Sequence, residues 1–84
     1  MNKTTERAVN VDRVEDLILV FGSFDENIRL LESELQVTVV NRGSELVISG
    51  DVEQVMLATK AVEALLTLSA KGEVINAQHV RYVI

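Results

Sequence analysis

Acidic residues and a single histidine are the side chains of this sequence that could carry acid–base or metal chemistry. The acids stand in close pairs: Asp25 with Glu26, Asp51 with Glu53, and Glu15 with Asp16. Two carboxylates at such a spacing can bind magnesium, but each pair stands where a helix is predicted to begin. The positive end of the helix dipole stabilises carboxylates there. Helix capping therefore accounts for all three pairs without a ligand.

His79 is the only histidine, and the nearest carboxylate, Glu73, stands six residues before it. A catalytic base or a metal site needs several partners in a fixed geometry. We therefore expect His79 to be a solvent-facing helix residue. The sequence has no cysteine that could act as a nucleophile, a disulfide partner or a thiolate ligand. No catalytic, cofactor-binding or metal-binding residue is predicted in this chain.

The composition is that of one small domain. Its 84 residues are 48% hydrophobic, which is ample for a core. The first residues, MNKTTERAVN, have no apolar run after their charges and do not form a signal peptide. No window approaches the roughly 18 apolar residues of a membrane helix. We expect a cytoplasmic domain with no membrane partner.

The charge balance argues against tight nucleic-acid binding by this chain alone. The formal net charge is −5, from 13 acidic and 8 basic residues, and no two basic residues adjoin. A domain that binds nucleic acid through phosphates needs a basic face, because counterion release supplies much of the affinity.

The first half of the chain is predicted to form a strand and two helices. Residues 7–12 alternate polar and apolar side chains, which indicates a strand. A capping-box-like D-R-V-E from Asp12 begins a helix, and Gly22 ends it in a left-handed conformation. S-F-D-E from Ser23 is a second capping box and begins the next helix. The expected inward stripes are Val14, Leu17, Ile18 and Phe21, then Phe24, Ile28, Leu31 and Leu35, with Arg29, Glu32 and Glu34 facing water.

A hairpin is predicted next. Residues 36–41 are rich in β-branched side chains and are predicted to form a strand, NRGS at 41–44 has the composition of a turn, and residues 45–49 return as the second strand. Leu46 and Ile48 are expected to face inward. Gly50 is then expected to break the second strand.

Two helices are predicted after the hairpin. Asp51 with Gln54 caps a long helix that stops at Lys71-Gly72. Its expected inward stripe is Val55, Ala58, Val62, Leu65, Leu66 and Ser69. Asn76 is expected to cap a short last helix that carries Val80 and Val83 or Ile84.

The element order is β-α-α-β-β-α followed by a short helix. Each helix has one apolar stripe, so all of them must lie on one face of the sheet. The predicted fold class is α+β, with helices packed on one face of a small three-stranded sheet. We expect a disordered N-terminal segment at 1–6, a folded domain at 7–69, and a linker with a short helix at 70–84.

This order, with a glycine between the first two helices, resembles the KH fold of RNA-binding modules. In KH domains a GxxG loop clamps about four nucleotides, because glycines and a helix N-terminus bring amides to the phosphates. Gly22 takes the place of the first glycine, and Ser23 and Phe24 take the middle positions. Asp25 takes the place of the second glycine. Asp25 and Glu26 repel phosphate and the loop has no cation, so capping explains this junction better than a phosphate clamp.

Two longer motifs carry a closer resemblance. FGSFDENIRLLESEL, with Leu19 before it, fits L-x-F-G-x-x-D-E-N-I-x-x-x-E, and RGSELVISG fits R-G-x-E-L-x-I-x-G. With the long helix and the KGEVINAQHVRYVI tail, they resemble the N-terminal KH-like region of PhoH-family proteins over about residues 7–84. The acidic D-E-N start is part of that family's pattern, so Asp25 is expected as a family feature.

The resemblance implies a cytoplasmic parent protein with a C-terminal P-loop ATPase domain, linked to RNA metabolism or phosphate starvation. ATP and magnesium would bind that domain and not this chain. A Walker A loop, G-x-x-x-x-G-K-[ST], is excluded here because glycines 22, 43, 50 and 72 lie too far apart and none precedes a lysine. The sequence ends on apolar residues at Ile84. Such an end is expected if the chain is cut from a longer one, and equally if the terminus docks on the domain.

Three functions remain open on the sequence. The first is a non-catalytic KH-like accessory domain that positions or assembles its own ATPase domain. The second is a single-stranded RNA-binding module, with Gly22, Ser23, Arg29 and Arg42 as candidate contacts; Arg42 could equally be a turn arginine beside Glu45. The third is a homo-oligomeric structural domain, which needs an unpaired strand edge or the apolar tail at Val80, Val83 and Ile84.

Overall fold

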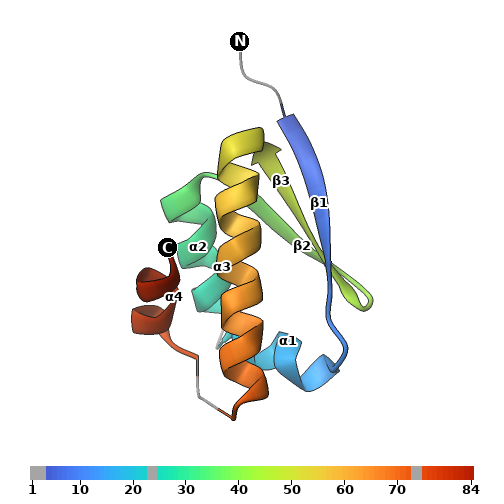
Figure 1. The fold of residues 1–84 in the computed structure, drawn as a ribbon, viewed down its shortest axis with the longest axis vertical. Helices are drawn as coiled ribbons and strands as arrows, with labels where there is room; N and C mark the ends of the chain where they lie inside the picture. Colours follow the sequence, from blue (N-terminus) through green and yellow to red (C-terminus); the bar gives the residue numbers. More distant parts are fainter. Residues whose placement is uncertain (1–3, 23–24, 73–74) are drawn as a thin grey trace.

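The computed structural model describes residues 4–22, 25–72 and 75–84. In these ranges the elements are β1 (Thr4–Asn10), α1 (Val14–Phe21), α2 (Glu26–Leu35), β2 (Thr38–Arg42), β3 (Glu45–Asp51), α3 (Val52–Ala70) and α4 (Ala77–Val83). The order is the expected one (Figure 1). The α+β fold class is confirmed.

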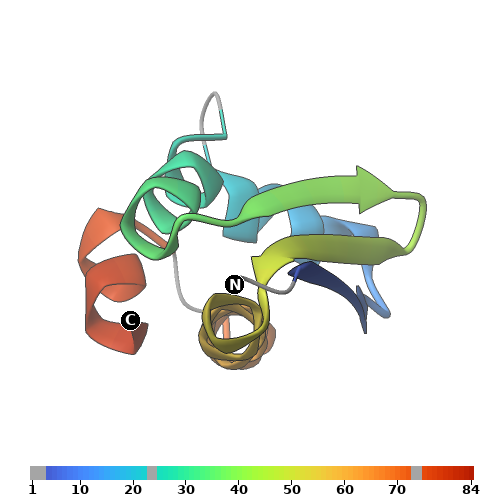
Figure 2. The ribbon, with the colours of Figure 1, turned by 90° about the horizontal axis from the view of Figure 1, so that it is seen from above.

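The three strands form one antiparallel sheet in the order β1-β3-β2, so β3 is the central strand. The helices pack on one face of this sheet (Figure 2). β2 and β3 form the predicted hairpin, in which Arg42 is the cross-strand neighbour of Glu45. Leu46 and Ile48 are fully buried, as the alternation along β3 predicted.

α3 is the centre of the helical layer and contacts β1, β3 and the other three helices. Its predicted stripe faces the core at helical spacing, with only Leu66 half-buried. Ile28, Leu31 and Leu35 of α2 are also buried as predicted. The apolar periodicity of these two helices therefore identifies the core correctly.

The predicted inward face of α1 is partly wrong. Leu17 is buried as expected, but Ile18 is 68% exposed, and Val20 is fully buried in its place. Asp16 is buried as well, and its Oδ1 accepts a 2.8 Å hydrogen bond from the Ser69 hydroxyl of α3. The reason is that α1 packs against α3, which turns the face of Asp16, Leu17 and Val20 inward.

Several element ends differ from the predictions. β1 begins at Thr4, so part of the segment expected to be disordered is a strand. β3 runs through Gly50 to Asp51, because both residues still pair with β1. α1 has Arg13 rather than Asp12 at its N-cap. Within the described ranges, neither Arg13 nor Asp51 caps its helix with a side-chain hydrogen bond, so both expected capping boxes are absent.

The last helix docks on the domain. α4 packs against α2 and α3, and Val80 is fully buried. The Oδ1 of Asn76, the predicted cap, accepts from the N–H groups of Gln78 and His79 at 3.0 and 3.2 Å. The Nδ1 of His79 in turn accepts from the Asn76 N–H at 3.3 Å. His79, expected to face solvent, is half-buried and completes a capping box.

The Ser69–Asp16 hydrogen bond should make a measurable contribution to stability. Ser69→Ala removes the donor and leaves a buried carboxylate oxygen without it, which costs about 1–3 kcal/mol. Urea denaturation followed by circular dichroism measures the loss. Thr67→Ala is the control, because the Thr67 hydroxyl bonds an exposed carbonyl in its own helix; we expect a change within about 0.5 kcal/mol. Equal effects of the two substitutions would contradict the assignment.

Candidate nucleic-acid interface

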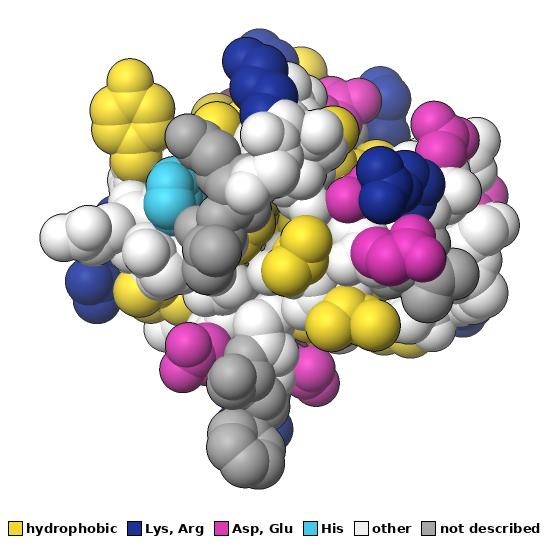
Figure 3. Space-filling model, turned by 90° about the horizontal axis from the view of Figure 1, so that it is seen from below, with side chains coloured by type: hydrophobic (Ala, Val, Ile, Leu, Met, Phe, Trp, Pro, Cys, Tyr) yellow, Lys and Arg dark blue, Asp and Glu magenta, His cyan; other side chains and the backbone are white. Residues whose placement is uncertain are grey.

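A hollow of about 230 Å³ lies where the end of α1 faces the end of β2. The described residues that line it are Leu17, Ile18, Phe21, Gly22, Asp25 and Asn41. Figure 3 views this end of the molecule and shows exposed apolar, acidic and basic side chains on it. Leu17, Ile18 and Phe21 supply the apolar part of the lining, one residue is acidic, and none of the described residues in it is a cation. The hollow therefore differs from a phosphate-binding groove.

Gly22 ends α1, and its N–H donates to the carbonyl of Ile18 at 3.0 Å. Its φ of 78° and ψ of −177° lie in a region that only glycine adopts readily, so the positive φ fits the prediction although ψ is extended. A Cβ at this position would lie 2.6 Å from the Nδ2 of Asn27. Glycine is therefore required both by the backbone conformation and by the approach of Asn27.

Asn27 explains that close approach. Its side chain is 1% exposed, and its Nδ2 donates to the carbonyl of Ile75 at 3.2 Å. This bond links the start of α2, beside Gly22, to the segment that precedes α4. Sequence reasoning missed Asn27, because an asparagine near a helix start is normally expected at the surface or in a cap.

The start of α2 is acidic, as predicted. Asp25 is its N-cap, with φ 59° and ψ 25°, and the Asp25 N–H donates to the carbonyl of Gly22 at 3.2 Å. Asp25 and Glu26 are both exposed. The expected capping box began at Ser23, which lies with Phe24 outside the described residues; α2 itself starts at Glu26, and Asp25 makes no side-chain capping hydrogen bond. Two carboxylates at this helix start disfavour a phosphate.

The register of the hairpin separates Arg42 from the hollow. Successive side chains of a strand point to opposite faces, and Asn41 lines the hollow on the face of the helices. Arg42 therefore lies on the opposite face of the sheet, beside Glu45. Arg29 is exposed on α2 and is not among the lining residues. Of the four predicted contacts, the structure places only Gly22 at the hollow, and Ser23 lies outside the described residues.

Asn41 and Ile18 line the hollow, and sequence reasoning missed both as candidate site residues. Asn41 could have been found by counting in steps of two from Val39, because both residues lie on the same face of β2. Ile18 could not, since the apolar pattern of α1 placed it in the core. An exposed isoleucine beside an amide side chain gives this hollow an apolar wall and a hydrogen-bonding group.

Relatives of known sequence cover most of the chain, although no family model matches it. A PhoH-like protein of Bacillus subtilis is 31% identical over 70 residues, which are 83% of this chain and 22% of the relative. A PhoH-like protein of Mycobacterium leprae is 34% identical over 73 residues, 86% of this chain and 21% of the relative. The resemblance to PhoH-like proteins is confirmed. The chain spans about a fifth of the length of these relatives.

Solved structures confirm that the fold is KH-like. The first KH type I domain of human Vigilin matches 82% of this chain and 78% of its own, with a TM-score of 0.71 and 18% identity. Dim2p from Pyrococcus horikoshii OT3 matches 95% of this chain and 48% of its own, with a TM-score of 0.76 and 17% identity. A complex of a/eIF2alpha, aDim2p and rRNA from the same organism also matches, with a TM-score of 0.75 and 19% identity.

The glycines of this chain do not lie in a P-loop. Gly22 ends α1, Gly43 lies in the hairpin turn, Gly50 lies in β3 and Gly72 follows α3. A phosphate-binding loop of that kind needs successive amides before a helix and a lysine that reaches the phosphates, and the described residues do not supply this arrangement. In the described ranges, no three acidic, histidine or cysteine side chains gather to hold a metal ion, and no helix is long and apolar enough to cross a membrane.

Substitution of Gly22 tests its structural role. Gly22→Ala forces an unfavourable backbone conformation and pushes the Asn27 side chain away, which should lower the free energy of unfolding by about 1–3 kcal/mol. Gly72→Ala is the control, because Gly72 also has a positive φ but a Cβ added there would meet no atom within 4 Å; the expected loss is about 1 kcal/mol. Chemical denaturation measures both. A smaller loss for Gly22→Ala than for Gly72→Ala would contradict the structural role of Gly22.

Proposed function

We propose that this chain is a non-catalytic KH-like domain of a PhoH-like P-loop ATPase, and that it contacts single-stranded RNA weakly through the hollow. The KH-like fold and the similarity to PhoH-like proteins support this proposal. The similarity to an aDim2p structure in complex with rRNA supports the RNA contact. The observation that carries it is the lining of the hollow by the end of α1, Gly22 and Asn41.

The chemistry of the hollow favours bases over phosphates. Single-stranded nucleic acids can be held by apolar contact with base faces and by hydrogen bonds to base edges. The exposed side chain of Ile18 and the half-buried ring of Phe21 supply the apolar contact. The amide of Asn41 has donors and an acceptor for a base edge. Asp25 keeps phosphates away, so binding gains little from counterion release.

The accessory role follows from what this domain lacks. The described residues offer no phosphate-binding loop, so ATP and magnesium would bind in the P-loop domain of the longer protein. We propose that this domain brings single-stranded RNA to that ATPase or positions it for assembly. By resemblance we place the protein in the cytoplasm, in RNA metabolism or in the response to phosphate starvation.

An RNA titration followed by NMR tests the contact. Short single-stranded RNA should shift the amide signals of Leu17, Ile18, Gly22 and Asn41. Ile18→Asp should weaken binding about ten-fold, because burial of an isoleucine is worth about 1.5 kcal/mol or more. Leu57→Asp is the matched control, since Leu57 is similarly exposed on α3 and should leave the affinity unchanged. Unmoved signals at millimolar RNA would reject the proposal.

The salt dependence distinguishes base contacts from phosphate contacts. With at most one phosphate contact, the affinity should fall by less than about three-fold between about 50 and 200 mM salt. Arg42→Ala should not change it, because Arg42 lies on the other face of the sheet. A steep salt dependence that Arg42→Ala removes would show that phosphates are bound at the hairpin instead.

Removal of the domain tests the accessory role. A PhoH-like protein that carries this domain should lose RNA-stimulated ATP hydrolysis, or change its oligomer size, when the domain is deleted. ATP turnover with and without single-stranded RNA, and mass by light scattering, measure the two effects. Identical turnover, RNA response and mass for the full and shortened proteins would argue against an accessory role.

A further inference from the structure

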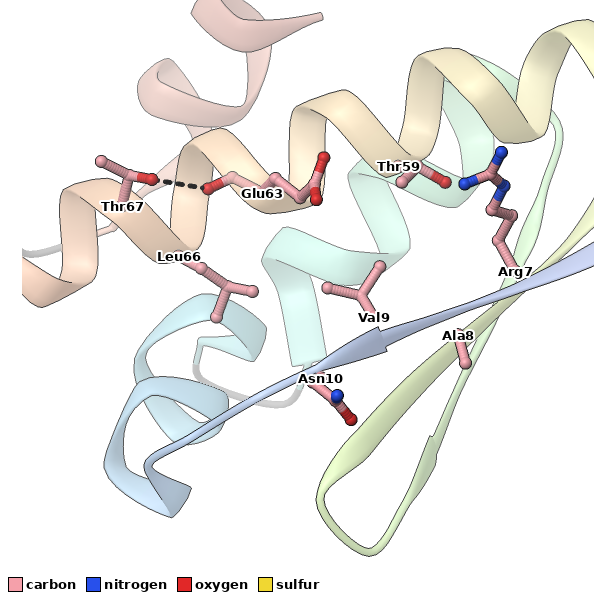
Figure 4. Close-up of a pocket in the computed structure, with 8 residues that line it drawn as sticks. All are labelled: Arg7, Ala8, Val9, Asn10, Thr59, Glu63, Leu66 and Thr67. Atoms are coloured by element: carbon pink, nitrogen blue, oxygen red, sulfur yellow. Dashed lines mark hydrogen bonds between the residues drawn. The ribbon is translucent and has the colours of Figure 1, made fainter.

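A second and larger hollow lies between the edge strand β1 and α3 (Figure 4). Its volume is about 420 Å³, and Arg7 and Val9 of β1 and Thr59, Glu63 and Leu66 of α3 are among the residues that line it. Arg7 and Glu63 are both exposed and have opposite charges. They are not paired with each other; in the described part of the chain the ion pair within 4.0 Å is Arg13 with Glu15. The hollow therefore offers one cation and one anion.

The free edge of β1 borders this hollow. The N–H of Val11, just after β1, donates to the carbonyl of Ser44 at 2.8 Å. This bond shows which residues of β1 direct their N–H and C=O groups toward β3. In an antiparallel pair, every second residue directs its N–H and C=O to the partner strand. The N–H and C=O groups directed outward therefore belong to Thr4, Glu6, Ala8 and Asn10. Among the described residues, no side chain and no loop bonds these groups.

One N–H on the opposite edge of the sheet is bonded by a side chain. By the same alternation, the N–H of Val39 points away from β3 on the outer edge of β2. The carboxylate of Glu32 in α2 accepts a 2.8 Å hydrogen bond from it. An unpaired strand edge is a template for another strand, and proteins commonly block such edges. Glu32 blocks β2 in this way at Val39, whereas in the described part of the chain no side chain blocks β1, which lies beside a hollow.

We propose that β1 pairs with β1 of a second copy of this chain, so that two three-stranded sheets join into one across a two-fold axis. Three antiparallel registers of the two β1 strands let their outward N–H and C=O groups bond to each other over five or more residues. One places Arg7 opposite Arg7 of the second copy, and another places Glu6 opposite Glu6. Like charges directly opposite are unfavourable. The remaining register places Ala8 opposite Ala8, with no like charges opposed.

That register also makes the charges of the hollow complementary. It places Arg7 of one copy opposite Val9 of the other, and Val9 lines the same hollow as Glu63. The guanidinium of each copy thus enters the hollow of the other and meets the Glu63 carboxylate there. The two-fold axis repeats the contact, as the self-complementary interface of a dimer requires. This interface is on β1 and α3, whereas the tail residue Val80 is buried within its own copy.

Sedimentation equilibrium of the 84-residue chain without RNA tests the proposal. The mass should rise from monomer towards dimer as the concentration increases from about 10 μM to 1 mM. Ala8→Pro removes an N–H that the monomer does not use, and proline is tolerated at such an edge position. The variant should keep its circular dichroism spectrum and bind its own copy at least ten-fold more weakly. A chain that is monomeric at every concentration, or a dimer that Ala8→Pro leaves intact, would overturn the proposal.

Charge reversal tests the register. Arg7→Glu and Glu63→Arg should each weaken the dimer, and the double variant should regain most of the wild-type affinity because the pair is re-formed with its charges exchanged. Glu34→Arg is the matched control, since Glu34 is also an exposed helix glutamate but lies on α2; it should leave the dimer unchanged. No recovery in the double variant would overturn the Ala8-centred register. Because RNA is absent, these results are independent of the proposed RNA contact.

Discussion

The fold depends on the close approach of the Asn27 side chain to Gly22. A Cβ at position 22 would lie 2.6 Å from the Asn27 Nδ2, so only glycine allows the amide to pass and reach the carbonyl of Ile75. This one contact joins the end of α1, the start of α2 and the segment before α4. Gly22 also lines the hollow beside Asn41. The glycine of this KH-like junction is thus explained by packing, with no bound phosphate required.

The electrostatics of the junction then decide what the hollow can hold. Asp25 and Glu26 occupy the helix start at which a phosphate would otherwise be attracted. The described lining is otherwise apolar or amide, and the candidate cation Arg42 is on the opposite face. A net charge of −5 adds a general repulsion of polyanions. The RNA contact that we propose relies on bases, which is compatible with these charges.

Much of the fold could be predicted from the sequence, because α2, α3 and the hairpin have a clear apolar periodicity. The buried face of α1 could not be predicted, because this short helix has apolar side chains on more than one face. Its packing against α3 buries Val20 and leaves Ile18 exposed. The Asp16–Ser69 hydrogen bond joins residues that are 53 positions apart, and no local pattern indicates it. Acidic residues at helix starts are typical of caps, yet neither Asp25 nor Asp51 makes a capping hydrogen bond. The residues of the candidate site were harder to predict. The position of Asn41 follows from the alternation of side chains along β2. The burial of Asn27 depends on a hydrogen bond to the carbonyl of Ile75, which is distant in the sequence.

The most direct measurement of the central claim is a set of intermolecular NOEs between the isotope-labelled domain and short single-stranded RNA. We predict contacts from base protons to the methyl groups of Ile18 and to the side-chain amide of Asn41. We also predict no contact between the sugar–phosphate backbone and the amides of Asp25 and Glu26. Backbone contacts at those two amides, with the bases pointing away from Ile18, would contradict the claim.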